Sequence, residues 1–155
     1  MSKTLSLKYP QNVRFLCDKC ALCCSNTEKK VRTILLLDVE AKRISKETKK
    51  AITEFAQKTE NSEPYVYKMK KTDEGKCIFL KDNLCTIYEI RPLICRFYPF
   101  ELKTVGDNYI FTFTNECPRI GRGLRLKKSY FEKLFKESAD LMLENTRERR
   151  SRNAT

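Results

Sequence analysis

The alternation of hydrophobic and polar positions divides the first half of the chain into a strand and a helical pair. The run Val31–Leu37 has β-branched residues early and apolar residues on both faces late, so it predicts a buried strand. We expect the following segment, 38–58, to be helical, with Asp38 as N-cap and a break near Ser45. Its second piece has an apolar face formed by Ala51, Ile52, Phe55 and Ala56.

The second half of the chain alternates short apolar runs with turn residues. Strands are expected at 65–69 and 77–80, and the segments 100–105 and 109–114 flank a Gly-Asp-Asn turn typical of a hairpin. Apolar residues then recur at helical spacing over about 129–147, after a capping-box pattern of Ser and Glu. The fold class predicted is α+β: a small mixed domain with short strands and a hairpin, a helical pair in the N-terminal half and a long C-terminal helix, organised around a cysteine-rich metal site.

Length and charge constrain the class of protein. A chain of 155 residues is long enough to bury a substantial core, so we expect one domain over 1–155, with its motif region at about 15–123. The net charge of +12 favours acidic partners, which include nucleic acid, acidic proteins and anionic membrane surfaces, without choosing among them. A protein partner, as yet unidentified, is expected.

The N-terminal stretch lacks the apolar core of a secretory signal, and the longest aliphatic run, Ile34–Leu37, is far shorter than a bilayer requires. We therefore expect no transmembrane segment and a cytoplasmic location, where thiols stay reduced. Cysteines in such a protein are interpreted as metal ligands before they are interpreted as disulfides.

Eight cysteines and no histidine define the candidate chemistry. Four of them fall within eight residues of the stretch FLCDKCALCCSN, and the others are widely spaced. All eight are predicted metal ligands: Cys17, Cys20, Cys23, Cys24, Cys77, Cys85, Cys95 and Cys117. The absence of imidazole excludes a Rieske centre or a histidine-based hydrolytic zinc site within this chain.

The spacing of the first cysteines leaves the metal open. Cys17-x-x-Cys20-x-x-Cys23 can wrap three corners of a cubane cluster, with the Cys-Pro dipeptide at Cys117 as a remote ligand. A zinc ion could equally use one Cys-x-x-Cys pair and two distant thiolates. Because Cys24 follows Cys23 at once, the motif is not that of a ferredoxin.

The adjacent Cys23 and Cys24 are expected to have different roles. In an extended backbone their side chains point to opposite sides. On a helix, positions 17, 20 and 24 share a face that excludes Cys23. Nearby cations add a second question: Arg91 and Arg96 flank Cys95, and they either support a cluster electrostatically or form ordinary salt bridges with acidic neighbours.

The order of the motifs resembles a known family. FLCDKCALCCSN, then CIFL, CTIYEIRPLICRFYPF and CPRIGRG are similar to the YkgJ-type cysteine-cluster family, a zinc- or iron-chelating domain with the CxxCxxCC signature. The similarity covers about Phe15 to Gly123 and includes all eight cysteines. It implies a metal- or cluster-binding domain. A related domain occurs in flagellin lysine N-methylases, but nothing in this sequence indicates a methyl-donor site.

Three hypotheses for function follow. The first is a redox or cluster-carrying protein that holds iron, as [4Fe–4S] in at least one site. The second is a structural zinc module whose basic surface binds nucleic acid or an acidic protein. The third is a protein-modifying, methyltransferase-like enzyme with a cluster, and whether the protein is an enzyme is left open.

Overall fold

The computed structural model describes residues 6–17, 24–26, 31–82, 84–114, 117 and 119–153. The chain folds into two compact units. The first unit comprises residues 1–18 and 97–138, and the second comprises residues 19–96 and 139–155. Each unit has its own hydrophobic core. The expectation of one domain over 1–155 stays a prediction.

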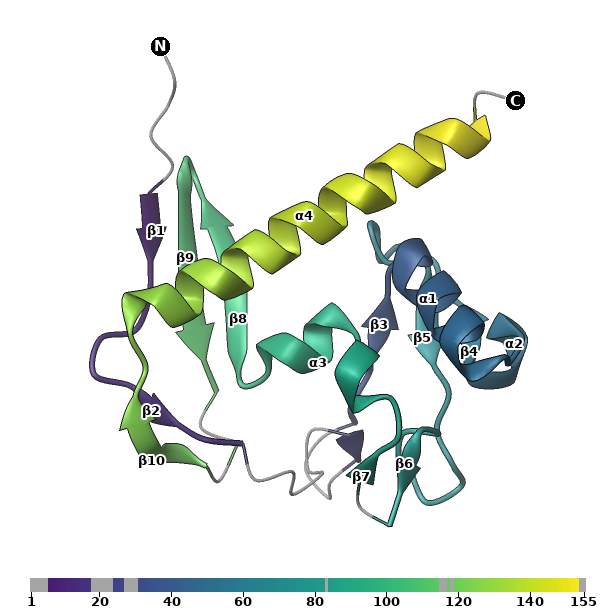
Figure 1. Ribbon diagram of the computed structural model, residues 1–155, viewed down its shortest axis with the longest axis horizontal. Helices are drawn as coiled ribbons and strands as arrows, with labels where there is room; N and C mark the ends of the chain where they lie inside the picture. Colours follow the sequence, from purple (N-terminus) through teal and green to yellow (C-terminus); the bar gives the residue numbers. More distant parts are fainter. Residues whose placement is uncertain are drawn as a thin grey trace. The chain divides into compact units, whose positions relative to one another are not determined.

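The first unit contains a three-stranded sheet and a two-stranded ribbon (Figure 1). In the sheet, β9 (Asn108–Phe113) lies between β8 (Phe100–Val105), to which it is antiparallel, and β1 (Ser6–Lys8), to which it is parallel. The ribbon pairs β2 (Arg14–Phe15) with β10 (Ile120–Arg125) in antiparallel orientation. The hairpin predicted around the Gly-Asp-Asn turn is therefore present as β8 and β9.

Aromatic side chains form the core of the first unit. Phe131, on the C-terminal helix α4 (Lys128–Asn153), is fully buried, and its ring lies 5.2 Å from those of Tyr9 and Phe100 and 5.3 Å from that of Phe111. Offset and edge-to-face pairs at such distances stabilise a core beyond the area that they bury. The N-terminal part of α4, up to Ser138, belongs to this unit.

The second unit has a small antiparallel sheet covered by a helix. The strand order is β3 (Leu35–Leu36), β5 (Tyr67–Met69) and β4 (Ala56–Lys58). The helix α1 (Asp38–Thr48) packs Ala41 and Ile44 against this sheet, in one apolar cluster with Leu36, Ala56 and Met69. The remaining elements are α2 (Ile52–Phe55), the hairpin of β6 (Leu80–Lys81) and β7 (Leu84–Cys85), the 3₁₀ turn η2 (Tyr88–Ile90) and the short helix α3 (Leu93–Phe97).

The mixed α+β class is confirmed, with small sheets, a helical pair in the N-terminal half and a long C-terminal helix among the described residues. Within the helical pair, two boundaries were predicted wrongly. The break in the helical pair lies after Thr48, where Lys49 adopts φ 60°, rather than near Ser45. The pair also ends at Phe55, because the following residues join β5 as a strand.

Two predicted helix caps were also wrong. Leu37, not Asp38, is the N-cap of α1, and Asp38 is instead paired with Lys42 across 3.1 Å. The helix α4 begins at Lys128, so Ser129 lies inside its first turn rather than at the cap. Among the described residues, no helix combines the length and the apolar character needed to cross a membrane.

Candidate metal site

Six of the eight predicted ligands lie within the described residues. Cys17 and Cys117 belong to the first unit, and Cys24, Cys77, Cys85 and Cys95 belong to the second. Cys20 and Cys23 lie outside the described residues. The assignment of all eight as metal ligands stays a prediction, and the structure adds the local setting of these six.

The end of the first cysteine cluster docks against the segment that carries Cys77. The strand predicted at 77–80 was wrong, because Cys77 forms an isolated bridge with Lys71 and β6 begins at Leu80. The Cys77 amide donates to the Cys24 carbonyl at 2.7 Å, and Ser25 forms an antiparallel bridge with Lys76. This register places Cys24 and Cys77 at opposing positions, where side chains of an antiparallel pair lie on the same side. Two cysteines that are distant in sequence are thus brought together by backbone pairing.

Asn26 fixes this docked segment from its other end. Its amide donates to the Gly75 carbonyl at 2.8 Å, and its side-chain oxygen accepts from the Arg32 amide at 2.8 Å and the Lys71 ammonium at 2.7 Å. Gly75 has φ +76°, and a Cβ atom there would come within 2.8 Å of the side-chain Nδ2 atom of Asn26. The turn before Cys77 therefore requires glycine for its backbone and for the space that Asn26 occupies.

Cys85 is positioned by the hairpin that follows Cys77. Leu80 pairs with Cys85 across β6 and β7, and the Leu80 amide donates to the Cys77 carbonyl at 2.9 Å. The next residue, Thr86, closes the hairpin because its amide and its hydroxyl both donate to the Phe79 carbonyl, at 2.9 and 2.8 Å. Cys77 is buried and Cys85 is half-buried.

Cys95 lies in the single turn of α3. The Pro92 carbonyl accepts from the Cys95 amide at 2.9 Å and from the Arg96 amide at 3.1 Å, which starts the helix. Proline suits this position because it has no amide hydrogen to satisfy at a helix start. The first helical amide, that of Leu93, donates to the carboxylate of Glu40 at 2.5 Å.

The two arginines that flank Cys95 support this loop. Arg91 stacks on the Tyr88 ring at 3.9 Å from its centroid and donates to the Tyr88 carbonyl at 2.9 Å. Arg96 donates to the carbonyls of Arg91 and Glu89, at 3.0 and 3.4 Å. These contacts tie both guanidinium groups to residues 88–91, in the loop that precedes Cys95.

The four cysteines of the second unit share one apolar environment. Cys77 is part of the buried cluster of this unit, and Cys24, Cys85 and Cys95 pack against the same cluster. Among the described residues, no three cysteine, aspartate or glutamate side chains are close enough together to hold a metal ion. Sulfur donors without imidazole nevertheless fit zinc or an iron–sulfur cluster by their chemistry.

Cys17 and Cys117 lie at one end of the β2–β10 ribbon. The register pairs Phe15 with Ile120, so Cys17 follows and Cys117 precedes a paired position at the same end. The Ile120 amide donates to the Cys117 carbonyl at 3.3 Å. Cys17 is exposed and Cys117 is buried.

Burial shifts the pKa values of two charged groups in the second unit. The pKa of Glu40 is raised by desolvation, which outweighs its hydrogen bonds from two backbone amides and the nearby charges of Arg96 and Arg43. The pKa of Lys71 is lowered, first by desolvation and then by the like charge of Lys68, whereas Cys77 acts in the opposite direction. No sequence pattern indicates the role of Glu40, because its partner at Leu93 is a backbone amide far along the chain.

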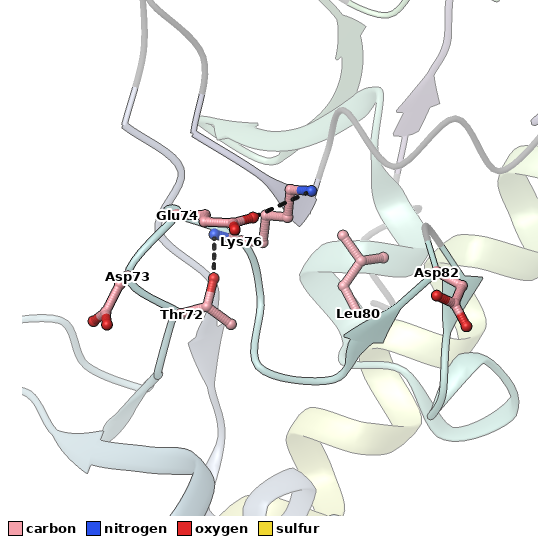
Figure 2. A pocket seen from close by; sticks show the side chains of 6 residues that line it. All are labelled: Thr72, Asp73, Glu74, Lys76, Leu80 and Asp82. Atoms are coloured by element: carbon pink, nitrogen blue, oxygen red, sulfur yellow. Dashed lines mark hydrogen bonds and ion pairs between the residues drawn. The ribbon is translucent and has the colours of Figure 1, made fainter.

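A hollow of about 560 Å³ lies beside the turn that leads to Cys77 (Figure 2). Two interactions join residues of its lining: Lys76 forms an ion pair with Glu74 at 3.6 Å, and the Lys76 amide donates to the Thr72 hydroxyl. It is lined by Thr72, Asp73, Glu74, Lys76, Leu80 and Asp82. Among the described residues that line it, none is a cysteine.

Comparison with known proteins identifies the motif region. The family "CxxCxxCC: Putative zinc- or iron-chelating domain" matches residues 16–118, about two thirds of the chain. The chain is also 28% identical over 137 residues to "Uncharacterized protein MJ0661" of Methanocaldococcus jannaschii, a similarity that covers 87% of this chain and 71% of that protein. No solved structure gives a significant match.

Proposed function

The chain belongs to the CxxCxxCC family of zinc- or iron-chelating domains, and we propose that it is a metal protein whose eight cysteine thiolates hold iron, as an iron–sulfur cluster, or zinc. The observation that carries this proposal is the packing of Cys24, Cys77, Cys85 and Cys95 against one apolar cluster. A free thiol in apolar surroundings stays protonated, and its thiolate becomes favourable only where a positive charge compensates it. A metal ion or cluster supplies that charge.

Within this proposal, Cys24 acts with Cys77, and Cys23 has a different role. The support is the backbone pairing of Cys24 with Cys77, through the 2.7 Å hydrogen bond and the adjacent bridge. Cys24→Ala and Cys77→Ala should therefore change the metal content or its spectrum in the same way, and Cys23→Ala in another. Identical losses in all three variants would contradict separate roles.

We favour iron, as [4Fe–4S] in at least one site, and a role in electron transfer or in support of a partner enzyme. The position of Arg91 and Arg96 close to Cys95 in the sequence supports this choice, because cations near a cluster raise its reduction potential. Purification without oxygen tests it. Stoichiometric iron and acid-labile sulfide in a brown protein are expected, and a colourless protein with stoichiometric zinc would replace the cluster with a zinc site.

The β2–β10 ribbon and the segments next to it favour a second function, that of a zinc module that binds an acidic partner. Residues 6–17 and 119–128 carry seven cationic side chains and no acidic ones: Lys8, Arg14, Arg119, Arg122, Arg125, Lys127 and Lys128. Leu16 and Leu124 on the same ribbon are 64% and 84% exposed. A cationic surface with apolar contacts suits an acidic protein or nucleic acid, and such binding weakens as salt rises.

Binding of an acidic partner by the ribbon is tested with the zinc-loaded chain and two probes, which are a single-stranded RNA of mixed sequence and an acidic peptide. Arg122→Glu should weaken salt-dependent binding, and Lys58→Glu, in the second unit, serves as a charge-matched control. Equal binding by both variants would remove the ribbon from this function.

A further inference from the structure

One buried carboxylate joins two helices of the second unit that lie far apart in sequence. Glu40, the third residue of α1, is only 5% exposed. One of its carboxylate oxygens accepts from the amide of Leu37, the N-cap of α1, at 3.1 Å, and the other accepts from the amide of Leu93, the first residue of α3, at 2.5 Å. The same side chain therefore satisfies an amide at the start of each helix.

The helix α3 depends on such an anchor. It has five residues, and helices this short are not stable by themselves in water. Its first amide has no partner within the helix, and water cannot replace Glu40 easily because Leu93 is only 2% exposed. Cys95 lies in the same turn, since its amide bonds to the Pro92 carbonyl.

We propose that Glu40 is a positioning residue for the metal site: by bridging the Leu37 and Leu93 amides, it fixes the turn that presents the Cys95 thiolate. This inference rests on the proposed function, because Glu40 matters to metal only if Cys95 is a ligand. Glu40 itself is not a ligand in this proposal, as both of its carboxylate oxygens are engaged by backbone amides.

Glutamine should not replace Glu40, although it has the same size. A carboxylate offers an acceptor oxygen to each amide, whereas an amide side chain has one oxygen and one NH₂ group. In Glu40→Gln, one backbone N–H would therefore face another donor. The chain offers a matched control in Glu54, whose carboxylate accepts from the Ala51 amide at 2.6 Å, also at the third position of a helix.

The experiment measures metal affinity with Co²⁺ as the probe, by competition with a chelator and by the absorbance of the thiolate–cobalt bands. Glu40→Gln should bind Co²⁺ about 10-fold more weakly or worse, as is typical when a side chain that orients a ligand is removed. Its thiolate–cobalt absorbance should also change. Glu54→Gln, whose helix start carries no cysteine, should bind like the wild type.

The outcomes separate the two proposals. If the wild type binds no Co²⁺, zinc or iron, the proposed function fails, and this inference fails with it. If the wild type binds and folded Glu40→Gln binds equally well with unchanged bands, the positioning role alone is overturned. The Co²⁺ affinity distinguishes a positioning role from a merely structural one. A general loss of stability would not weaken Co²⁺ binding by a variant that circular dichroism shows to be folded.

A measurement on the wild type keeps the inference testable if Glu40→Gln does not fold. The Leu93 amide should exchange slowly with solvent and should resonate downfield in an NMR spectrum, because it donates to a buried carboxylate. Exchange at the rate of an unprotected amide would overturn the positioning role.

Discussion

Gly75→Ala tests the geometry that joins the first cysteine cluster to Cys77. Gly75 has φ +76°, and an added Cβ would lie 2.8 Å from the Nδ2 atom of Asn26 and 3.2 and 3.3 Å from its Cβ and Cγ atoms. Rotation of the amide group cannot relieve all three contacts. The Asn26 side chain must therefore move, and its hydrogen bonds from the Arg32 amide and the Lys71 ammonium are expected to weaken.

The magnitude follows from two contributions. A left-handed backbone conformation costs a residue other than glycine about 1–2 kcal/mol. Loss of the two Asn26 side-chain hydrogen bonds adds about 0.5–1.5 kcal/mol each. Gly75→Ala should therefore lower the free energy of unfolding by about 2–5 kcal/mol.

The hairpin turn of the first unit provides the control. Gly106 also has a positive φ, of +61°, but an added Cβ there would have nothing within 4 Å. Gly106→Ala should show only the backbone contribution, about 1–2 kcal/mol. Urea titration of both variants, followed by circular dichroism, measures the difference. Equal destabilisation would refute the claim that Asn26 packs against Gly75 and holds Cys24 at Cys77.

Three further predictions concern other parts of the chain. Burial raises the pKa of Glu40 above its value of 4.5 in the unfolded chain, so the contribution of Glu40 to the free energy of unfolding should be largest below pH 4.5. That contribution should fall as pH rises through the raised pKa and then level off. Urea titrations at several pH values should show this trend in the wild type and not in Glu40→Gln. Asn145→Ala removes the 3.3 Å hydrogen bond that the buried Val39 amide donates to the Asn145 side chain, and it should lower the free energy of unfolding, measured in urea, by about 1 kcal/mol. An unchanged free energy would contradict the role of Asn145 as a cap for the first turn of α1. Phe131→Ala removes a fully buried ring and should lower the free energy of unfolding by about 3–5 kcal/mol, seen as a lower melting temperature. Phe113 is 41% exposed, so Phe113→Ala should lower the free energy of unfolding much less.

The elements predicted correctly from sequence are those with strong local signals. The hairpin of β8 and β9 follows from two alternating runs around a turn whose Gly106 has positive φ. The helix α4 follows from apolar residues at helical spacing, and it extends past the predicted end at 147 because the Arg-rich segment remains helical.

The early end of the helical pair has a non-local cause, which is pairing between segments distant in sequence. Ala56 has an apolar side chain that fits a helix, but its backbone pairs with Met69 in β5. The parallel pairing of β1 with β9 likewise depends on residues about a hundred positions apart, and no local pattern indicates it.

For the candidate site, the sequence predicts a chemistry but not a geometry. Cysteine count and spacing, together with the absence of histidine, indicate sulfur ligands. The pairing of Cys24 with Cys77 depends on a backbone bridge, and the support of Cys95 by Glu40 depends on a carboxylate that binds an amide in another helix. Neither contact leaves a pattern in one sequence.

X-ray absorption at the iron or zinc edge of the protein purified without oxygen identifies the atoms that bind the metal. The account predicts a first shell of sulfur atoms alone, with zinc–sulfur distances of about 2.3 Å if zinc is bound, and with iron neighbours beyond the sulfur shell if a cluster is bound. A shell dominated by oxygen or nitrogen would contradict it, as would native protein without iron or zinc.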